Sequence, residues 1–267
     1  MRINLWQGLI IFLAAFIAGM MNSVAGGGTL VTFPALIWIG IDPKAANVTS
    51  TIALWPGSLG GMLGFRRELS GSRRWMLLLA PSSIIGGLVG AVLLLRTPSR
   101  VFASIVPYLI LFATILFAAQ EPLTRWVRRE DQETRHAKTA SANRKQAPTR
   151  AWWIGATIFQ FFTAVYGGYF GAGIGIVMLA VLGLLGLTDI HQMNGLKNFF
   201  AVCINVIASV YFMLRGEVVW VAALIMILGA IAGGYGGAGL AHKLGRRFVR
   251  RTVIAVGLIM TISLLFR

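Results

Sequence analysis

Apolar residues fill ten long stretches of this sequence, and short polar connections separate them. Most stretches are about 15 to 22 residues long, which is enough for a helix to cross the hydrocarbon core of a bilayer. They are continuously apolar, whereas the strands of a membrane barrel alternate between apolar and polar residues. The pattern predicts an all-α, polytopic membrane protein with segments at about 4–24, 28–41, 46–65, 75–95, 100–119, 151–170, 174–187, 192–214, 218–241 and 249–266.

The longest polar stretch, residues 121–150, divides these segments into two groups of five. It holds eight basic and four acidic residues, a composition that anionic lipid headgroups attract. We therefore predict a first membrane repeat at 1–120, a mobile basic linker on the cytoplasmic side at 121–150, and a second membrane repeat at 151–267.

The two groups of segments are related by an internal repeat. Sliding the chain along itself by 147 residues (from residue 6 to residue 153) aligns the halves without gaps. Aligned pairs include Trp6 and Trp153, Gly28 and Gly175, Asn47 and Asn194, Gly86 and Gly233, and Arg100 and Arg247. An ungapped register over this length indicates a duplication of one structural unit.

Basic residues exchange places between the two repeats. The connection after the third segment is basic in the first half, with four arginines in residues 66–74, and nearly neutral in the second. The connection after the fourth segment is basic in the second half, with five basic residues in 243–251. Because basic connections face the cytoplasm, the repeats are predicted to be inverted, with the N-terminus outside. The second segment of each repeat, about 20 Å long as a helix, is predicted to be a half-helix or a re-entrant piece.

Composition agrees with a membrane protein and excludes several other classes. Hydrophobic residues make up 57% of the chain and charged residues 12%, too few to cover a soluble domain of this size. The net charge of +16 sits almost entirely between apolar segments, so no nucleic-acid partner is expected. One cysteine, Cys203, and three scattered histidines give no metal-binding spacing, so no metal and no cofactor are predicted.

Two glycine clusters precede the short second segments. Adjacent glycines break helices, and a broken helix inside a membrane usually lines a cavity where its free N–H groups can bind an anion. We therefore predict substrate contacts at Asn22, Gly26, Gly27, Gly28 and Thr29, and at Gly171, Gly173 and Gly175. The alternative is close helix packing through small residues, which we favour for Gly86, Gly90, Gly233 and Gly237.

A second polar cluster opens the third segment of each repeat. It comprises Asn47, Ser50 and Thr51 in the first half, and Asn194, Lys197 and Asn198 at the equivalent positions of the second. Residues four apart share a helix face, so each cluster is predicted to line the same site as the glycines. Helix capping and interhelical hydrogen bonds are the alternative.

Lys197 is the one Lys or Arg inside an apolar segment rather than at its end or in a connection, and all eight acidic residues lie in connections. An ionisable residue within a membrane helix is a candidate functional group, although a lysine so near its helix start could also extend to the surface. A pathway with a cation and no carboxylates suits an anionic substrate.

The stretch from Gly19 to Thr51, with its three consecutive glycines, Pro34, the Gly40-x-x-Pro43 motif and Ala46 to Ser50, resembles the TauE/SafE family. The second half departs from this pattern, since Gly171-Ala172-Gly173 replaces the glycine triplet and Val181 stands where Pro34 would recur. The resemblance implies a permease of prokaryotic inner membranes that exports sulfite or organosulfonates.

These observations predict a secondary transporter of a small anion that works by alternating access between inverted repeats. A passive anion channel is the main alternative, and an intramembrane enzyme the weaker one, because the sequence offers no catalytic constellation such as H-E-x-x-H. Expected partners are the small anion and anionic membrane lipids, and a homodimer is left open.

Overall fold

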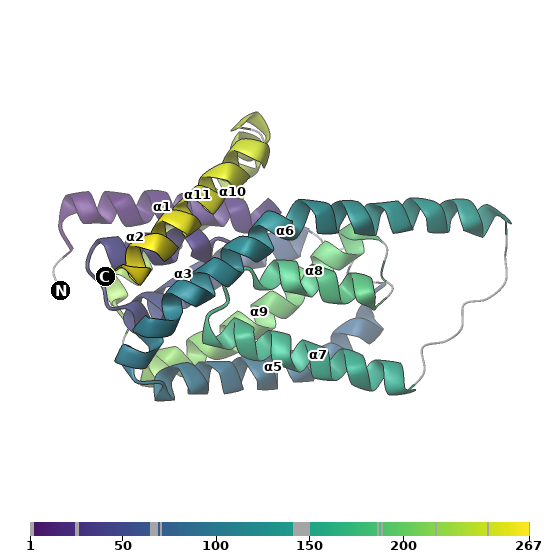
Figure 1. Cartoon of the computed structure of the whole chain (residues 1–267), viewed down its shortest axis with the longest axis horizontal. Coiled ribbons are helices and arrows are strands. Elements are labelled where there is room, and N and C mark those ends of the chain that lie inside the picture. Colours follow the sequence, from purple (N-terminus) through teal and green to yellow (C-terminus); the bar gives the residue numbers. More distant parts are fainter. Residues whose placement is uncertain are drawn as a thin grey trace.

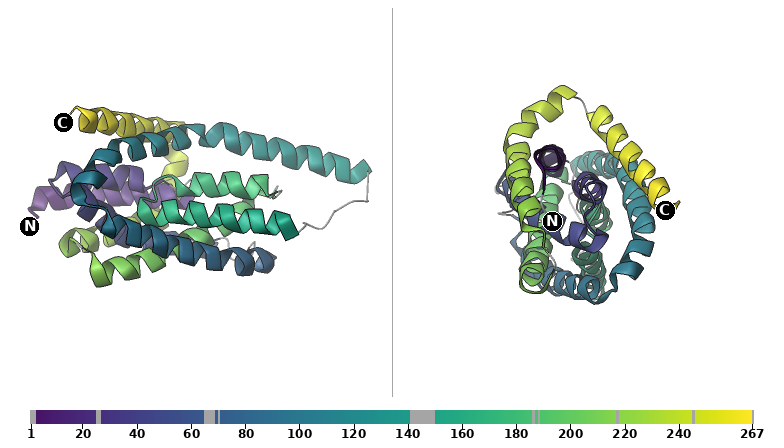
Figure 2. Two further views of the ribbon diagram at one scale, coloured as in Figure 1. Left: turned by 60° about the horizontal axis from the view of Figure 1, so that its bottom comes forward. Right: turned by 90° about the vertical axis from the view of Figure 1, so that its left-hand side faces the viewer.

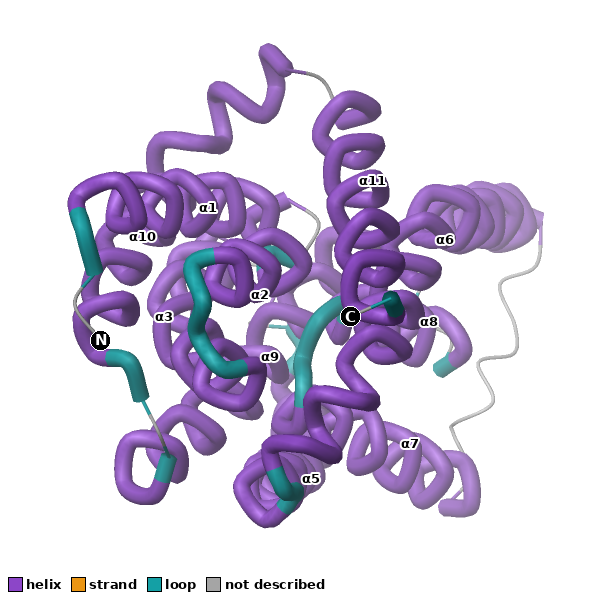
Figure 3. Tube along the Cα trace, turned by 60° about the vertical axis from the view of Figure 1, so that its left-hand side comes forward, coloured by secondary structure: helices purple, strands orange, loops and turns teal. Residues whose placement is uncertain are grey.

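The computed structural model describes residues 3–24, 27–64, 69, 71–140, 150–185, 187, 189–216, 218–244 and 246–266. In these residues the regular structure is helical, joined by short loops (Figures 1 and 3). The helices are α1 (Leu5–Val24), α2 (Thr29–Trp38), α3 (Pro43–Gly64), α5 (Arg73–Arg96), α6 (Ser99–Ala140), α7 (Arg150–Tyr169), α8 (Ile174–Leu184), α9 (Ile190–Arg215), α10 (Trp220–Leu244) and α11 (Arg246–Leu265). Each predicted segment coincides with one helix, and the all-α prediction is confirmed.

The polar stretch between the repeats differs from the prediction in its first part. Helix α6 continues to Ala140 instead of ending near residue 119, and its C-terminal part projects beyond the bundle (Figure 1). This stretch is rich in Glu, Gln, Arg and Ala, which are strong helix formers, so it can remain helical without packing. The rest of the predicted linker up to residue 149 lies outside the described residues.

Many large apolar side chains point outward, and several polar side chains such as Thr32, Gln160 and Lys197 are buried, the arrangement expected for a protein surrounded by lipid. Leu77, Ile154, Phe162, Leu228 and Ile259 are among many exposed apolar residues on α5, α7, α10 and α11, far more than a soluble protein exposes as one surface. Within the described residues, four helices are long and apolar enough to cross a membrane: α1, α5, the first part of α6, and α9. The chain is thus a multi-pass membrane protein.

The two short helices are bounded by residues that cannot continue a helix. Before α2 stands Gly27, with φ of +93°, and after it stands Gly40, with φ of +90°. Before α8 stand Gly171 and Gly173, with φ of +74° and +76°, a region that glycine enters without steric cost. Helices of 10 and 11 residues extend about 15 Å, half of a bilayer core, so the prediction of short second segments is confirmed.

Glycines bring α5 against α7 and α1 against α10. A Cβ on Gly86 or Gly90 would collide with the backbone of α7 at Phe161 and Val165. A Cβ on Gly233 would collide with the carbonyl of Phe16 in α1. The packing role predicted for these three glycines is confirmed, whereas the side-chain position of the fourth, Gly237, lies outside the described part.

The same contacts fix helix directions. Helices α1 and α10 run parallel to each other in the same direction, and so do α5 and α7. The start of α3 lies at the end of α5, because Lys44 Nζ donates to the carbonyls of Leu95 and Thr97 at 2.8 and 2.9 Å. The start of α10 lies beside α3, where the Val219 N–H donates to Thr49 Oγ1 at 3.1 Å. Hence α1 and α7 run in opposite directions, as Figure 1 shows.

Packing partners also exchange between the halves. Under the 147-residue offset, helices α1, α2, α3, α5 and α6 correspond to α7, α8, α9, α10 and α11. Helix α1 packs along α10 and α7 along α5, while α3 packs on α10 and α9 on α5. The remaining large contacts, α3 with α9 and α6 with α11, join corresponding helices; α6 and α11 lie side by side at one edge of the end-on view (Figure 2).

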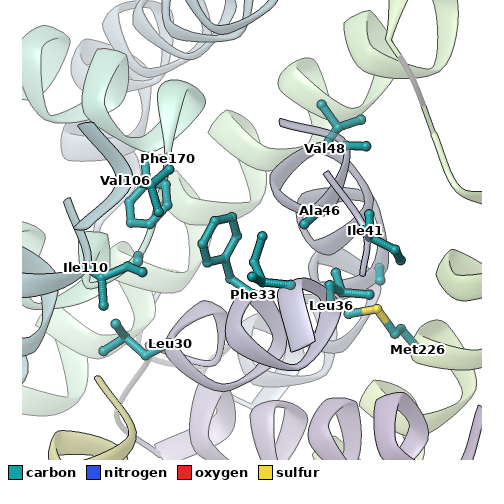
Figure 4. Packing of buried hydrophobic residues seen from close by; sticks show 14 of the residues in the cluster. Leu30, Phe33, Leu36, Ile41, Ala46, Val48, Val106, Ile110, Phe170 and Met226 are labelled. Atoms are coloured by element: carbon teal, nitrogen blue, oxygen red, sulfur yellow. The ribbon is translucent and has the colours of Figure 1, made fainter. Parts of the chain in front are cut away.

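The main apolar core surrounds α2, where the halves meet. Leu30 and Phe33 of α2 lie toward Ile110 of α6 and Phe170 at the end of α7, while Leu36 lies beside Ile41 and Met226 (Figure 4). The rings of Phe33 and Phe170 meet edge to face, with centroids 5.4 Å apart. This core fixes the glycine turn of the second half against the short helix of the first.

Candidate functional site

The first glycine turn is held by a side-chain cap. Asn22, near the end of α1, accepts a hydrogen bond from the Gly28 N–H through Oδ1 at 2.8 Å. A Cβ on Gly28 would lie 2.7 Å from the carbonyl oxygen of Ala18, so only glycine fits there. The Asn22 side chain thus occupies the N–H of Gly28, a backbone group that was predicted to be free to bind an anion. Thr29 begins α2 and is half-buried. Gly26 lies outside the described residues.

A short chain of hydrogen bonds connects this turn to α3. The buried hydroxyl of Thr32 lies 2.6 Å from the hydroxyl of Ser50 and donates to the carbonyl of Gly28 at 3.3 Å. Ser50 and Thr32 are fully buried. The structure therefore joins the predicted residues Gly28 and Ser50 through Thr32, which the sequence did not single out because a lone threonine in an apolar segment carries no periodic signal.

The second glycine turn has a different anchor. The Tyr166 hydroxyl donates to the carbonyl of Ala172 at 2.6 Å, between Gly171 and Gly173. Several amides of the turn are also used within it, since Ile174 N–H donates to Gly171 O and Ile176 N–H to Gly173 O. Gly175 lies buried in the first turn of α8. Both glycine clusters therefore break helices as predicted, and their lining of a cavity stays a prediction.

Asn47 connects the two halves. Its Nδ2 donates to the carbonyl of Tyr169, the last residue of α7, at 2.8 Å. Its Oδ1 is buried and has no hydrogen-bond partner in the described part of the chain. Thr51, four residues along α3, donates its hydroxyl to the carbonyl of Asn47 at 2.9 Å. One polar face of α3 thus reaches the second glycine turn and still holds an unsatisfied acceptor.

Lys197 lies inside the protein. Its side chain is 3% exposed, and its Nζ donates to Asn194 Oδ1 at 3.2 Å. Lys197 therefore does not extend to the surface, which was the alternative left open by the sequence. Its position in α9 is about 10 Å from the helix start, the same depth as that of Ser50 in α3.

Asn198, next to Lys197, is 6% exposed, and its Nδ2 is a buried donor without a hydrogen-bond partner among the described residues. Leaving a buried polar group unsatisfied costs about 1–3 kcal/mol. Asn198 follows Lys197 on α9 and Asn47 precedes Ser50 on α3, and these two helices pack against each other. Near the starts of these paired helices the described residues thus include an unsatisfied donor, an unsatisfied acceptor and a buried cation, and Ser209 Oγ is a further unsatisfied atom farther along α9.

The described acidic side chains are used elsewhere. Asp42 accepts from the Lys44 N–H at 2.9 Å at the start of α3, and Asp189 accepts from the His191 N–H at 2.8 Å at the start of α9. Both carboxylates are exposed helix caps at equivalent positions of the repeat. In the described residues no group of His, Cys, Asp and Glu could hold a metal ion.

The sequence also missed contacts that join elements far apart. Thr49 Oγ1 accepts a hydrogen bond from the Val219 N–H at the start of α10, and Ser72 Oγ accepts one from Gln192 Nε2 at 2.9 Å. These contacts tie the third helices to the starts of α10 and α5. Only their polar residue types were visible in the sequence, because the partners lie more than a hundred positions away.

Comparisons with known proteins place these features in a family. Residues 11–264 match the family model described as sulfite exporter TauE/SafE. A probable membrane transporter protein of Haemophilus influenzae is 27% identical over 262 residues, which cover 96% of this chain and 94% of the relative. The probable membrane transporter protein YfcA of Escherichia coli K12 is 25% identical over 96% of this chain and 89% of its own length.

A probable membrane transporter protein, ORF9, of a Sinorhizobium species is 29% identical and covers 96% of this chain and 91% of the relative. No solved structure matches the chain. The family model spans nearly the whole chain, including both glycine turns and both polar clusters on α3 and α9. The chain is therefore a membrane transporter that belongs to the TauE/SafE sulfite exporter family.

Proposed function

We propose that this protein is a secondary transporter that exports a small sulfur-containing anion, such as sulfite or an organosulfonate. The observation that carries the proposal is the buried Lys197. Its one described hydrogen bond goes to a neutral amide, and the two described carboxylates cap helices at the surface. A buried cation is strongly disfavoured unless it is paired, so an anion at Lys197 would supply the missing charge.

The neighbours of Lys197 suit an oxyanion. The unsatisfied Nδ2 of Asn198 is a donor, and the remaining two protons of the Lys197 ammonium are donors as well. A sulfite or sulfonate group presents three oxygen acceptors, and charge-assisted hydrogen bonds are about twice as strong as neutral ones. The residues proposed to contact the anion directly are therefore Lys197 and Asn198, with Asn194 orienting the ammonium group.

Alternating access between inverted repeats is the proposed mechanism. Helix directions support it, because α1, α3 and α10 run opposite to α5, α7 and α9. In three of the corresponding pairs, α1 with α7, α3 with α9 and α5 with α10, the two helices therefore point in opposite directions. The exchange of packing partners between the halves supports a two-fold relation, with the α3–α9 contact at its centre and the candidate site on those two helices.

Sulfur-containing substrates are proposed on the family description, sulfite exporter TauE/SafE. Residence in the inner membrane of a prokaryote is proposed on the bacterial relatives. The same relatives are probable membrane transporters, which supports a role other than that of an enzyme. The passive anion channel is the second candidate, and the kinetics of flux separate it from a transporter.

The test is flux of radiolabelled sulfite and sulfoacetate into proteoliposomes that contain the purified full-length protein. We expect saturable uptake of at least one anion, slowed by unlabelled substrate. Flux that grows linearly with concentration would favour the channel, and flux equal to that of empty vesicles across this panel would overturn anion transport altogether.

A further inference from the structure

A cluster of two arginines and three tryptophans lies at the starts of α5 and α7, and we call it the Arg–Trp patch (Arg73, Arg74, Trp75, Trp152 and Trp153). The ring of Trp75 lies 5.5 Å from that of Trp152 and 5.0 Å from that of Trp153. The guanidinium carbon of Arg74 lies 5.0 Å from the ring centre of Trp153. Both arginines are exposed, so the patch presents positive charge beside a rigid aromatic surface.

An apolar hollow adjoins this patch. It has a volume of about 220 Å³, is open to the outside, and is lined by Trp153, Ile154, Thr157 and Ile158 of α7. Ile154 and Ile158 are 60% and 52% exposed, and the Thr157 hydroxyl is used by a bond to the carbonyl of Trp153 at 2.9 Å. The hollow therefore offers an apolar surface to whatever surrounds α7.

The distance between the Arg–Trp patch and the hollow matches the distance between the headgroup and the acyl chains of a phospholipid. From Trp153 to Ile158 the helix rises about 7.5 Å, the depth that separates a headgroup from the first part of its acyl chains. Tryptophans prefer this interface, and arginine binds phosphate oxygens through two parallel hydrogen bonds. We infer that the Arg–Trp patch and the hollow form one binding site for an anionic phospholipid.

In this site the lipid phosphate lies on Arg73 and Arg74, and one acyl chain lies along Ile154 and Ile158. Charge complementarity selects an anionic over a zwitterionic lipid, since both arginines of the patch are exposed and carry positive charge.

The experiment is native mass spectrometry of the full-length protein in detergent, titrated with phosphatidylglycerol or phosphatidylcholine. Each basic side chain near a membrane surface contributes a factor of about five in anionic-lipid binding, so Arg73→Gln with Arg74→Gln should weaken phosphatidylglycerol binding by about 25-fold. The control is Arg96→Gln with Arg100→Gln, two exposed arginines at the other end of α5, for which less than a twofold change is expected.

Two further arms test the shape of the site. Ile158→Trp fills the hollow and should weaken phosphatidylglycerol binding while both arginines remain, and inorganic phosphate should compete poorly because it lacks acyl chains. Equal binding of both lipids, equal loss in both arginine pairs, or full competition by phosphate would overturn the site. Unchanged binding by Ile158→Trp would overturn its acyl-chain half, and the anion flux of the protein tests the proposed function independently.

Discussion

Helices α3 and α9 share a framework and differ in chemistry. Each begins with an exposed aspartate cap, Asp42 or Asp189, and each has an asparagine five positions later, Asn47 or Asn194. Three positions further along, however, α3 has Ser50 and α9 has Lys197. The comparison shows that the two helix starts are alike under the 147-residue offset, while α9 has a buried charge where α3 has a neutral serine.

The two positions also differ in how well their hydrogen bonds are satisfied. Ser50 is paired with Thr32, which in turn is bonded to the Gly28 carbonyl. Lys197 has one described bond, at 3.2 Å, to Asn194. A neutral, satisfied position stabilises the fold, whereas a charged, incompletely satisfied one gains free energy when an anion arrives. We therefore expect the site to be asymmetric, with the anion closer to α9.

Replacing Lys197 tests this difference between α3 and α9 most directly. Lys197→Met keeps an unbranched side chain of similar length and removes the buried charge, so we expect a folded protein with a melting temperature equal to or above that of wild type. The anion loses a charge-assisted hydrogen bond of about 1.5–3 kcal/mol, which corresponds to roughly 10- to 100-fold in affinity. Flux in proteoliposomes and a melting curve of the purified variant measure the two effects.

Lys44→Met is the matched control for that substitution. Lys44 lies one position from the start of α3 and holds the last carbonyls of α5, so its loss should lower the melting temperature. Its flux should stay within about twofold of wild type, because Lys44 caps a helix end. Equal loss of flux from both lysine variants would show that net charge, rather than the place of Lys197, controls transport.

For the helix packing that the two halves share, we expect the opposite: equivalent substitutions should lower the stability equally. Gly86→Ala and Gly233→Ala each place a Cβ against a carbonyl of the neighbouring helix, at Phe161 and Phe16. Overpacking of this kind costs about 1–3 kcal/mol, and we expect the two melting temperatures to fall alike. Gly155→Ala is the control, since a Cβ there meets nothing within 4 Å. A large difference between Gly86→Ala and Gly233→Ala would argue against the two-fold framework.

Most of this framework was predictable from sequence, because its signals are local. Apolar runs gave ten segments, and glycines with positive φ, such as Gly27 and Gly173, end or begin helices where the sequence placed breaks. The helical extension of α6 to Ala140 was not predicted, since a polar segment without an apolar face has helix propensity as its only signal.

The site was predictable in its residue types and not in its pairings. Lys197 and Asn198 stood out as polar residues in an apolar segment, and both are buried. That Asn22 caps Gly28, or that Asn47 reaches the carbonyl of Tyr169, depends on how distant helices pack. A repeated sequence does not encode such pairings in any local pattern.

Asn198→Thr sharpens the comparison by giving α9 the residue that α3 has at the equivalent position, Thr51. Thr51 bonds to the carbonyl four residues earlier, and a threonine at 198 can bond in the same way. Removing the unsatisfied Nδ2 should leave the stability unchanged or raise it by up to about 1 kcal/mol. Anion affinity should fall by up to about tenfold, measured as the shift in half-saturation of flux. A loss of stability with unchanged affinity would remove Asn198 from the site.

Ser50→Ala should have the smallest effect of all. Thr32 keeps its bond to the Gly28 carbonyl when the serine hydroxyl is lost, so the cost should be about 1 kcal/mol or less, and flux should remain near wild type. The measurement is flux and melting temperature beside Lys197→Met, because the equivalent positions of two repeats are then compared in one assay. If Ser50→Ala abolished transport while the protein stayed folded, the anion would contact both halves equally, and the asymmetric site would be wrong.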